Sequence, residues 1–561
     1  MTGEQATRRA EEEAPSAYAF PLLLKHLLAS GVARAPEQEI IYRDIARFDY
    51  QTLAKRVAKL ANSLSDLGIG VGDTVGVLDW DSNRYLESYF AIPGIGAVLH
   101  MVNIRLSPEQ ILYTINHARD DALLVHADFL PMLEGIWDRI ENVRAVIVLT
   151  DMDEIPATAL PIKAEYEAML SMAESEYLFP DFDENMRATT FYTTGTTGLP
   201  KGVFFSHRQL VLHSLVLAGS MAAAPVQGRL HRSDIYMPIT PMFHVHAWGL
   251  PFIATMLGLK QVYPGRYAPA SLLALQQAEG VTFSHCVPTL LQMLLTSAEA
   301  TDIDLRGWKI VIGGAALPKA LVHSALERGI DIFAGYGMSE TCPVLSIAQL
   351  TEEQLADESA EMVEARTRAG RPVPLVDLRI VDADMEPLPG DGKSAGEIVV
   401  RAPWLTQAYS GDPISSAMLW EGGYLHTGDV GVLHPDGTLQ ITDRVKDLIK
   451  TGGEWISSLE IEDLISQLEG VSEVAVIAVP DFRWGERPLA VVVRKAGFES
   501  LTEAMVKAHI KTFCERGQIS KWAVPERVMF QILLEKTSVG KLDKKKLREQ
   551  YCASKLSNHS G

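Results

Sequence analysis

The sequence predicts an α/β protein built from a large N-terminal body and a small C-terminal domain. In the first 180 residues, segments with helical periodicity alternate with short apolar runs, which is typical of helices packed on a mixed or parallel sheet. The sequence pattern changes to short β-like runs near residue 378, and a separate series of helix and strand patterns follows Lys450. The length of 561 residues allows about three or four domain-sized pieces.

Individual elements of the body follow from period and run length. Apolar residues recur at helical spacing from Tyr50 to Leu67, which predicts a helix there. Short apolar runs predict buried strands at Thr74–Leu78, Ala122–Val125, Val281–Ser284, Lys309–Ile312 and Asp331–Ala334. The body is therefore predicted to hold two α/β subdomains.

The last 190 residues divide differently. Runs at Leu378–Val381 and Glu397–Arg401, with Asp-Gly turns between later runs, predict a β-rich subdomain over about 375–442. A charged, glycine-containing stretch from Thr442 to Gly453 is typical of a hinge or an active-site loop. Beyond it we expect helices at Leu459–Leu468 and Glu503–Cys514, with strands at Val474–Val479, Leu489–Val493 and Val528–Ile532.

Composition excludes several classes of protein. There are 51 Lys+Arg against 71 Asp+Glu, a formal charge of −20, which argues against a nucleic-acid protein built on a basic stripe. The four cysteines have neither disulfide nor metal spacing. The start of the chain does not resemble a signal peptide. The uncharged stretch from Ile235 to Leu259 contains three prolines and two histidines, so we expect buried loop and helix rather than a membrane span. A cytoplasmic location is the expectation.

The most distinctive local feature is the loop Tyr192-Thr-Thr-Gly-Thr-Thr-Gly-Leu-Pro-Lys-Gly202. Glycines let backbone N–H groups approach an anion, hydroxyls add donors and Lys201 adds charge, so the loop suits a phosphate. It does not match the Walker A pattern, because Lys201 lacks the preceding glycine and the following Ser/Thr. Composition alone leaves a plain Gly/Thr-rich surface loop open.

Further motifs follow in a fixed order: Gly313-Gly-Ala-Ala316, Gly335-Tyr-Gly-Met-Ser-Glu-Thr341, Tyr424-Leu-His-Thr-Gly-Asp429, Asp443-Arg-Val-Lys-Asp447 and Ser538-Val-Gly-Lys541. With the threonine/glycine loop, this ordered set resembles the adenylate-forming superfamily, which includes acyl-CoA synthetases, luciferases and peptide-synthetase adenylation domains. The resemblance extends over nearly the whole chain and implies the acyl-CoA synthetase-like fold.

The resemblance assigns a nucleotide site. Thr193 and Glu340 correspond to positions that hold Mg²⁺, a hard cation suited to oxygen ligands. Tyr336 corresponds to the aromatic residue stacked on adenine, and Asp429 to the carboxylate that binds the ribose hydroxyls, supported by Arg444. The other residues implied to contact ATP are Thr194, Gly195, Thr196, Thr197, Gly198, Lys201, Gly314, Ala315, Ala316, Gly335, Gly337, Thr341, Lys446, Lys450 and Trp455.

The catalytic residue implied by the resemblance is Lys541, which would reach the carboxylate and the α-phosphate. A fixed cation and Mg²⁺ would stabilise the charge that develops between two anions. Taken alone, the run Lys541, Lys544, Lys545 and Lys546 is also typical of a solvated helix face. Lys446 falls on the hinge position, about which the C-terminal domain turns, so the resemblance implies that this domain is mobile.

A subgroup resemblance concerns the acyl substrate. Pro241-Met-Phe-His-Val-His-Ala-Trp-Gly-Leu-Pro251 and Gly453-Glu-Trp-Ile-Ser-Ser458 resemble bacterial fatty acyl-CoA synthetases. In that subgroup Trp248 is a gate on the acyl tunnel, with Phe243 and the catalytic candidate His244 near the carboxylate. Pantetheine would enter beside Gly452 and Gly453, and CoA is the implied acceptor.

We therefore expect a Mg·ATP-dependent fatty acid–CoA ligase that forms acyl-AMP and pyrophosphate, then acyl-CoA and AMP, with medium to long chains favoured. A short-chain or aryl-CoA ligase and an enzyme that loads a carrier protein remain alternatives. A non-catalytic nucleotide-binding protein on this fold is the alternative of a different class. The predicted division is 1–442, hinge 443–449 and 450–561, in a homodimer with no nucleic-acid partner and no integral membrane segment.

Overall fold

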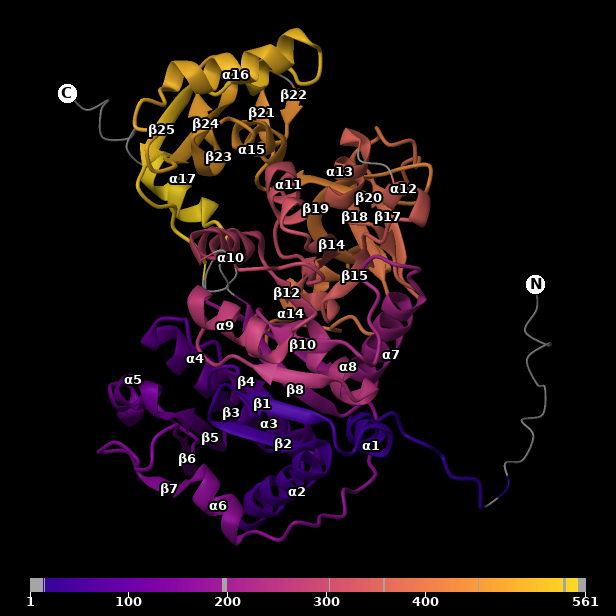
Figure 1. Cartoon of the computed structure of the whole chain (residues 1–561), viewed down its shortest axis with the longest axis vertical. Helices are drawn as coiled ribbons and strands as arrows, with labels where there is room; N and C mark the ends of the chain where they lie inside the picture. Colours follow the sequence, from indigo (N-terminus) through magenta and orange to yellow (C-terminus); the bar gives the residue numbers. More distant parts are fainter. Residues whose placement is uncertain are drawn as a thin grey trace.

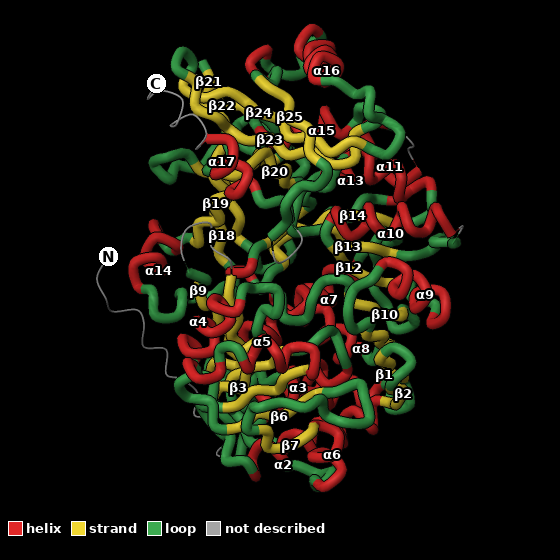
Figure 2. The backbone as a smooth tube through the Cα atoms, turned by 90° about the vertical axis from the view of Figure 1, so that its left-hand side faces the viewer, coloured by secondary structure: helices red, strands yellow, loops and turns green. Residues whose placement is uncertain are grey.

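The computed structural model describes residues 14, 16–193, 199–301, 303–356, 359–452, 454–537 and 541–552. Two large sheets form the body, a four-stranded sheet adjoins them, and a further sheet with its helices lies at the opposite end from the N-terminal sheet (Figures 1 and 2). The α-helices are α1 Lys25–Arg34, α2 Tyr50–Asp66, α3 Asn83–Gly94, α4 Pro108–Ala118, α5 Leu130–Glu134, α6 Tyr166–Met172, α7 His207–Ala223, α8 Leu250–Leu257, α9 Pro269–Glu279, α10 Pro288–Thr301, α11 Lys319–Glu327, α12 Glu352–Ala356, α13 Ala360–Thr367, α14 Pro413–Leu419, α15 Ser458–Ser466, α16 Glu503–Glu515 and α17 Lys544–Cys552.

The seven-stranded sheet has the order β7-β6-β5-β3-β4-β8-β9, parallel except for the last pair. β3 and β5 are buried along their whole length, as expected for parallel strands covered on both faces. Its strands are β3 Thr74–Leu78, β4 Val98–Met101, β5 Ala122–His126, β6 Ala145–Leu149, β7 Ile162–Glu165, β8 Arg187–Thr193 and β9 Lys201–Ser206.

The nine-stranded sheet has the order β16-β15-β14-β13-β12-β10-β11-β1-β2 and is parallel from β14 to β1. It joins strands from residues 39–49 to strands from residues 235–372, a pairing that no local pattern could predict. Its strands are β1 Glu39–Tyr42, β2 Ala46–Asp49, β10 Ile235–Pro238, β11 Lys260–Tyr263, β12 Phe283–Cys286, β13 Lys309–Ile312, β14 Asp331–Gly337, β15 Val344–Ile347 and β16 Arg371–Pro372.

One hydrophobic core joins the facing sides of the two sheets. It contains apolar side chains of both sheets and of α2, α3, α7 and α8. All twelve residues of α3 are buried, so this helix lies inside the body rather than on its surface. Separate cores cover the outer faces, where α4 and α5 pack on one sheet and α9, α10 and α11 pack on the other.

Two antiparallel-rich units complete the chain. The four-stranded sheet contains β17 Asp377–Val381, β18 Gly396–Arg401, β19 Leu425–Leu433 and β20 Leu439–Arg444. The C-terminal sheet contains β21 Ile449–Thr451, β22 Glu454–Ile456, β23 Val471–Asp481, β24 Gly485–Arg494 and β25 Arg527–Gln531. α15 and α16 contribute to the core on one of its faces and α17 to that on the other.

The predicted elements named above are confirmed, with boundaries that shift by only a few residues. The uncharged stretch from Ile235 to Leu259 forms β10, a short turn and α8, which confirms loop and helix in place of a span. Within the described part of the chain, we find no helix with the length and apolar character needed to cross a bilayer.

Candidate active site

A small cavity lies where β13 and β14 end. Its volume is about 50 Å³, and its wall combines backbone of the two glycine motifs with apolar side chains. The lining includes Leu217, Met221, His244, Val245, Trp248, Gly313, Gly314, Gly335, Tyr336, Gly337, Val344 and Lys541. The structure thus brings together the predicted adenine motifs, the predicted acyl gate and the predicted catalytic lysine.

Lys541 comes from the C-terminal domain and lies against the body. A Cβ placed on Gly314, whose φ is +77°, would be 3.1 Å from Lys541 Cε, so a larger residue there would be strained and would press on the lysine. Burial, with a smaller contribution from the charge of Arg444, lowers the pKa of Lys541 to about 8, although Asp429 and Glu340 partly oppose this. Lys541 is therefore a desolvated amine whose charge is favoured by Asp429 and Glu340 of the body.

Asp429 is held by two residues of the predicted nucleotide site. Tyr336 OH donates to Asp429 Oδ2 at 2.9 Å, and Arg444 Nε donates to Asp429 Oδ1 at 3.1 Å. Asp429 and Arg444 are direct neighbours across β19 and β20, so the sheet register sets their pairing. An aromatic ring, a carboxylate and a guanidinium are thus locked together beside the cavity.

Glu340 has a partner that the sequence did not suggest. Its side chain is buried, and Tyr409 OH donates to its Oε1 at 2.8 Å. Burial raises the pKa of Glu340, which the Tyr409 hydrogen bond and Lys541 oppose. Lys201 Nζ lies 4.7 Å from the centre of the Tyr409 ring and donates to Ser415 Oγ at 2.7 Å. The only sequence signal for Tyr409 is its place before a Gly-Asp-Pro turn.

The predicted phosphate loop is described at its two ends. Thr193 ends β8 and pairs directly with Lys201, the first residue of β9. Thr194, Gly195, Thr196, Thr197 and Gly198 lie outside the described residues, as do Gly453 and Ser538 to Gly540.

Trp248 lies on a left-handed turn, η3 (Val245–Gly249). Residues 245 to 248 have φ between +46° and +60° although none is glycine. Such backbone costs about 1–2 kcal/mol per residue, so the surrounding contacts must impose it. The Trp248 ring is buried, 5.0 Å from the His285 ring, and a Cβ on Gly313 would be 2.9 Å from it.

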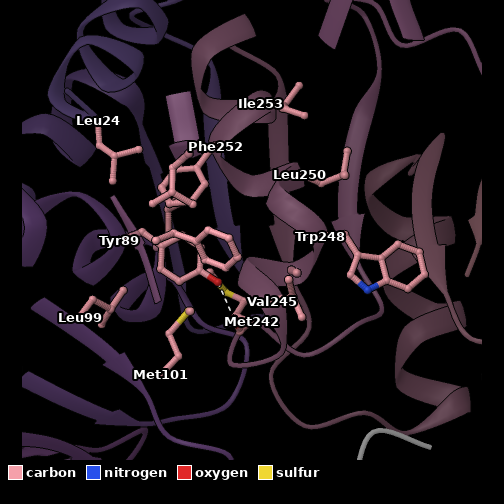
Figure 3. Packing of buried hydrophobic residues seen from close by; sticks show 14 of the residues in the cluster. Leu24, Tyr89, Leu99, Met101, Met242, Val245, Trp248, Leu250, Phe252 and Ile253 are labelled. Carbon is pink, nitrogen blue, oxygen red and sulfur yellow. Dashed lines mark hydrogen bonds between the residues drawn. The ribbon is translucent and has the colours of Figure 1, made fainter. Parts of the chain in front are cut away.

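The segment that precedes this turn is held by side chains that follow β3 or lie on α3. Met242 N–H donates to the buried carboxylate of Asp81 at 2.9 Å, and Tyr89 OH donates to Met242 O at 2.5 Å (Figure 3). Asp81 also accepts from Tyr267 OH. In Figure 3 the Trp248 side chain stands apart from the cluster around Phe252, Tyr89 and Met242.

His244 is a neutral imidazole in this environment. Burial lowers its pKa to about 3, and the charges of Lys541 and Arg105 act in the same direction. Phe243 is buried beside it, with Arg105 Cζ 6.0 Å from its ring centre. His244 can therefore donate one hydrogen bond and accept another, but it does not carry charge near neutral pH.

Several predicted residues lie away from the cavity. Lys450 and Trp455 pair across β21 and β22, with Trp455 60% exposed, and neither lines the cavity. A Cβ on Gly452 would be 3.0 Å from the Trp522 ring. The hydroxyl of Thr341 bonds within its own turn, to Met338 and Pro343. Ala315, Ala316 and Lys446 are exposed.

Contacts around the predicted hinge fix the position of the C-terminal domain. Asp443 accepts from Ser458 N at 2.5 Å, and Arg548 Nη1 donates to Asp447 at 2.6 Å. Lys319 N at the start of α11 donates to Asp463 at 3.2 Å. These bonds accompany the placement of Lys541 in the cavity.

Comparison with known proteins shows the family to which the chain belongs. Residues 28–410 match the AMP-binding enzyme family, and residues 460–541 match the AMP-binding enzyme C-terminal domain. The chain belongs to the AMP-binding enzyme family. The predicted membership of the adenylate-forming superfamily is confirmed, and the chain is accordingly an acyl-CoA ligase of the AMP-forming type.

Individual relatives align with nearly the whole of this chain. A long-chain-fatty-acid–CoA ligase of Thermus thermophilus is 40% identical over 543 residues, 94% of this chain and 96% of its own. A 3-methylmercaptopropionyl-CoA ligase of Ruegeria lacuscaerulensis is 36% identical over 540 residues, 95% and 97% of the two chains. The crystal structure of the anthranilate CoA ligase AuaEII with anthranoyl-AMP is 23% identical and has a TM-score of 0.84, covering 96% and 99%, which confirms the predicted fold.

Proposed function

We propose that this family member is a fatty acid–CoA ligase with a preference for medium to long chains. Lys541 supports the proposal most directly, because it enters a cavity walled on one side by Tyr336 and on another by apolar side chains around Trp248. A nucleotide phosphate and an acyl carboxylate would meet at such a cation.

In the first step, a carboxylate oxygen forms a bond to the α-phosphorus of ATP, and the bond from that phosphorus to pyrophosphate breaks. Asp429 would hold the ribose hydroxyls, and Tyr336 would pack on adenine. Lys541 would stabilise the negative charge that gathers between carboxylate and phosphate, which needs position and charge rather than proton transfer. Neutral His244 would orient the carboxylate by hydrogen bonding.

The residues present fit a magnesium site of the kind shared with a nucleotide. Among the described residues, no cluster of three acidic, histidine or cysteine side chains could hold a metal alone. Mg²⁺ characteristically uses one or two carboxylates and the phosphates of its substrate, and Glu340 has an oxygen that Tyr409 leaves free. Glu340 and Thr193 would hold the ion, which when bound would neutralise phosphate charge.

In the second step, CoA sulfur attacks the acyl carbon and AMP leaves. The C-terminal domain would turn about Lys446 so that Lys541 withdraws and Gly452 and Gly453 line the thiol entry, with Lys450 and Trp455 approaching the nucleotide. This movement implies a body of residues 1–442, a hinge of residues 443–449 and a mobile domain of residues 450–561. The homodimer and the cytoplasmic location stay predictions.

A second candidate substrate is 3-methylmercaptopropionate or another short acid. The cavity of about 50 Å³ has little room for a long chain while Trp248 packs on His285 and Gly313. A relative with 36% identity carries the corresponding name.

A carboxylate panel tests both. Purified protein with Mg·ATP and CoA is given straight-chain acids from acetate to stearate, with benzoate and 3-methylmercaptopropionate, and AMP release is measured. We expect the highest kcat/KM at eight carbons or more. A maximum at short acids would favour the second candidate, and no AMP release with any acid would refute both.

A further inference from the structure

A second cavity lies at the carboxyl ends of β3, β5 and β6, where they face the ends of β1 and β11. Its volume is about 350 Å³, and it shares no lining residue with the cavity around Lys541. Its wall includes Arg43, Trp80, His126, Asp128, Asp151 and Arg266.

The topology places this cavity at a switch point. β3 connects through α3 to β4 on one side, whereas β5 lies on the other side of β3 and continues to β6. Relabelled in chain order, β3 to β7 have the order 2-1-3-4-5 of flavodoxin-like sheets, in which ligands bind where the connections diverge. That crevice lies between the residues after β3 and those after β5, Trp80 and Asp128 among them.

A buried polar atom in the wall has only a long contact within the protein. His126 is 4% exposed, and its Nδ1 accepts from Asp128 N at 3.2 Å, so the proton lies on Nε2. Nε2 makes no hydrogen bond to the described residues, and its one ionic contact, with Asp151 Oδ2, is long at 3.6 Å. A buried N–H with only this long contact would gain from a closer acceptor on a ligand or a water.

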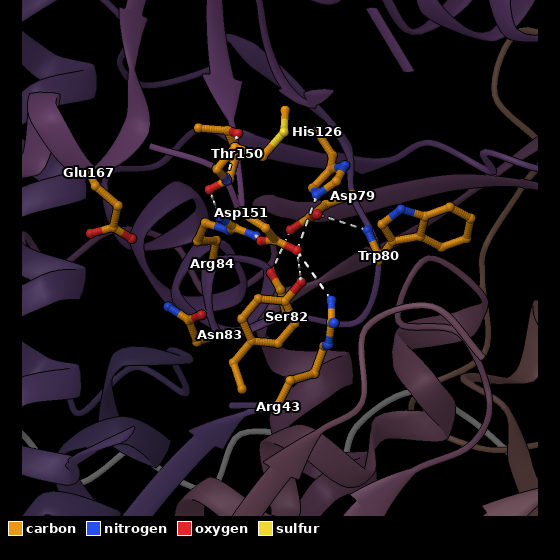
Figure 4. A network of polar contacts seen from close by, with 12 residues as sticks. Arg43, Asp79, Trp80, Ser82, Asn83, Arg84, His126, Thr150, Asp151 and Glu167 are labelled. Atoms are coloured by element: carbon orange, nitrogen blue, oxygen red, sulfur yellow. Dashed lines mark hydrogen bonds and ion pairs between the residues drawn. The ribbon is translucent and has the colours of Figure 1, made fainter. Parts of the chain in front are cut away.

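The acidic groups around His126 are already engaged. Asp151 accepts from Arg84 Nη2 at 2.5 Å and from Tyr42 OH at 2.8 Å, while Arg43 Nη1 lies 3.5 Å away (Figure 4). Trp80 Nε1 donates to Asp128 at 2.9 Å. Burial opposes charge on His126, but Asp151, Asp79 and Asp128 outweigh it and raise its pKa.

Two guanidinium groups at the mouth are available to an anion. Arg43 is close to half exposed and only loosely paired with Asp151. Arg266 is exposed, with Cζ 5.7 Å from the Trp80 ring centre. Guanidinium groups bind phosphate well, and the exposed carboxylate of Asp128 can accept from hydroxyls.

We propose that this switch-point cavity binds a phosphorylated, hydroxyl-bearing small molecule. Its phosphate would lie between Arg43 and Arg266 and accept from His126 Nε2–H, and its hydroxyls would face Asp128. A sugar phosphate and the ribose phosphate of a nucleotide share this chemistry, and the cavity volume is within the usual range for small-ligand sites.

Calorimetry on the full-length protein with ribose 5-phosphate tests the site without depending on ligase activity. We expect saturable binding that weakens about tenfold or more in Arg43→Gln and in Arg266→Gln. Arg306→Gln is the matched charge control and should bind as the parent does, because Arg306 is exposed and pairs, among the described residues, with Asp304. Asp128→Asn should weaken ribose 5-phosphate but leave inorganic phosphate unaffected.

A nucleotide ligand and a sugar phosphate ligand can be distinguished in Asp429→Ala, because this variant lacks the carboxylate proposed to bind ribose beside the other cavity. Tighter binding of AMP than of ribose 5-phosphate there identifies a nucleotide, and equal binding identifies a sugar phosphate. The proposal is overturned if the parent shows no binding up to about 10 mM, or if Arg43→Gln and Arg266→Gln bind like Arg306→Gln.

Discussion

The two cavities lie at the carboxyl ends of strands in the two large sheets, and they differ in which parts of the chain supply their charged side chains. The cavity of the nine-stranded sheet is small and largely apolar, and its cation, Lys541, comes from another domain. The cavity of the seven-stranded sheet is larger and has several charged side chains in its wall, and these come from the body alone. The same strand geometry thus supports one site that needs a domain in place and one that does not.

The largest effect within the body should come from Glu340, a buried carboxylate next in the chain to Ser339, which lines the first cavity. Glu340→Gln keeps the shape and the Tyr409 contact but loses the charge, so acyl-AMP formation should fall about 10²–10³-fold. Pyrophosphate exchange measures it, with exposed Glu352→Gln as control. A loss of less than about threefold would break the assignment of Glu340.

Gly314 tests whether the domain contact itself matters. Gly314→Ala puts a Cβ 3.1 Å from Lys541 Cε and strains a φ of +77°, and Gly307→Ala strains a φ of +80° with nothing within 4 Å. Adenylation should fall about tenfold more in Gly314→Ala than in Gly307→Ala, because only the former displaces Lys541. Equal rates in the two variants would mean that backbone strain explains the whole effect.

A smaller effect is expected from pH, through the lysine of the first cavity. The pKa of Lys541 is lowered to about 8, so the charged form is lost as pH rises through that value. For the free enzyme, kcat/KM for ATP should therefore decline above pH 8, since this parameter reports free-enzyme ionisation. In Lys541→Arg, whatever activity survives should stay level to pH 9.5. A parent profile that is flat across the same range would contradict the buried-lysine account.

The smallest effect is expected from the second cavity. Arg43→Gln and Arg266→Gln change residues that line the second cavity and not the first, so acyl-AMP formation without added ribose 5-phosphate should stay within about twofold. Initial rates at saturating substrates measure this. A large loss would show that the two cavities are not independent.

Much of the fold could be predicted because its strands are continuous apolar runs, such as Thr74–Leu78 and Lys309–Ile312, and local pattern identifies these. Lys541, Tyr336 and Asp429 were found through motifs, and the structure brings them together. Tyr409 was missed because it reaches Glu340 across 69 residues.

The second cavity was also missed, for a reason that is topological. Arg43, Trp80, His126, Asp151 and Arg266 stand on five separate strand ends, and only the packing of two sheets makes them neighbours. The left-handed turn at Trp248 likewise has no local signal, because residues 245–248 include no glycine and the anchors at Asp81 and Tyr89 are remote in sequence.

The most direct test of the central claim, that the C-terminal domain supplies the charge for adenylation only, separates the two half reactions in Lys541→Ala. Acyl-AMP formation is followed by pyrophosphate exchange, and thioester formation by CoA consumption from supplied acyl-AMP, with exposed Lys545→Ala as control. We predict a loss of about 10³-fold in the first and less than about threefold in the second. Equal losses in both half reactions would contradict the account.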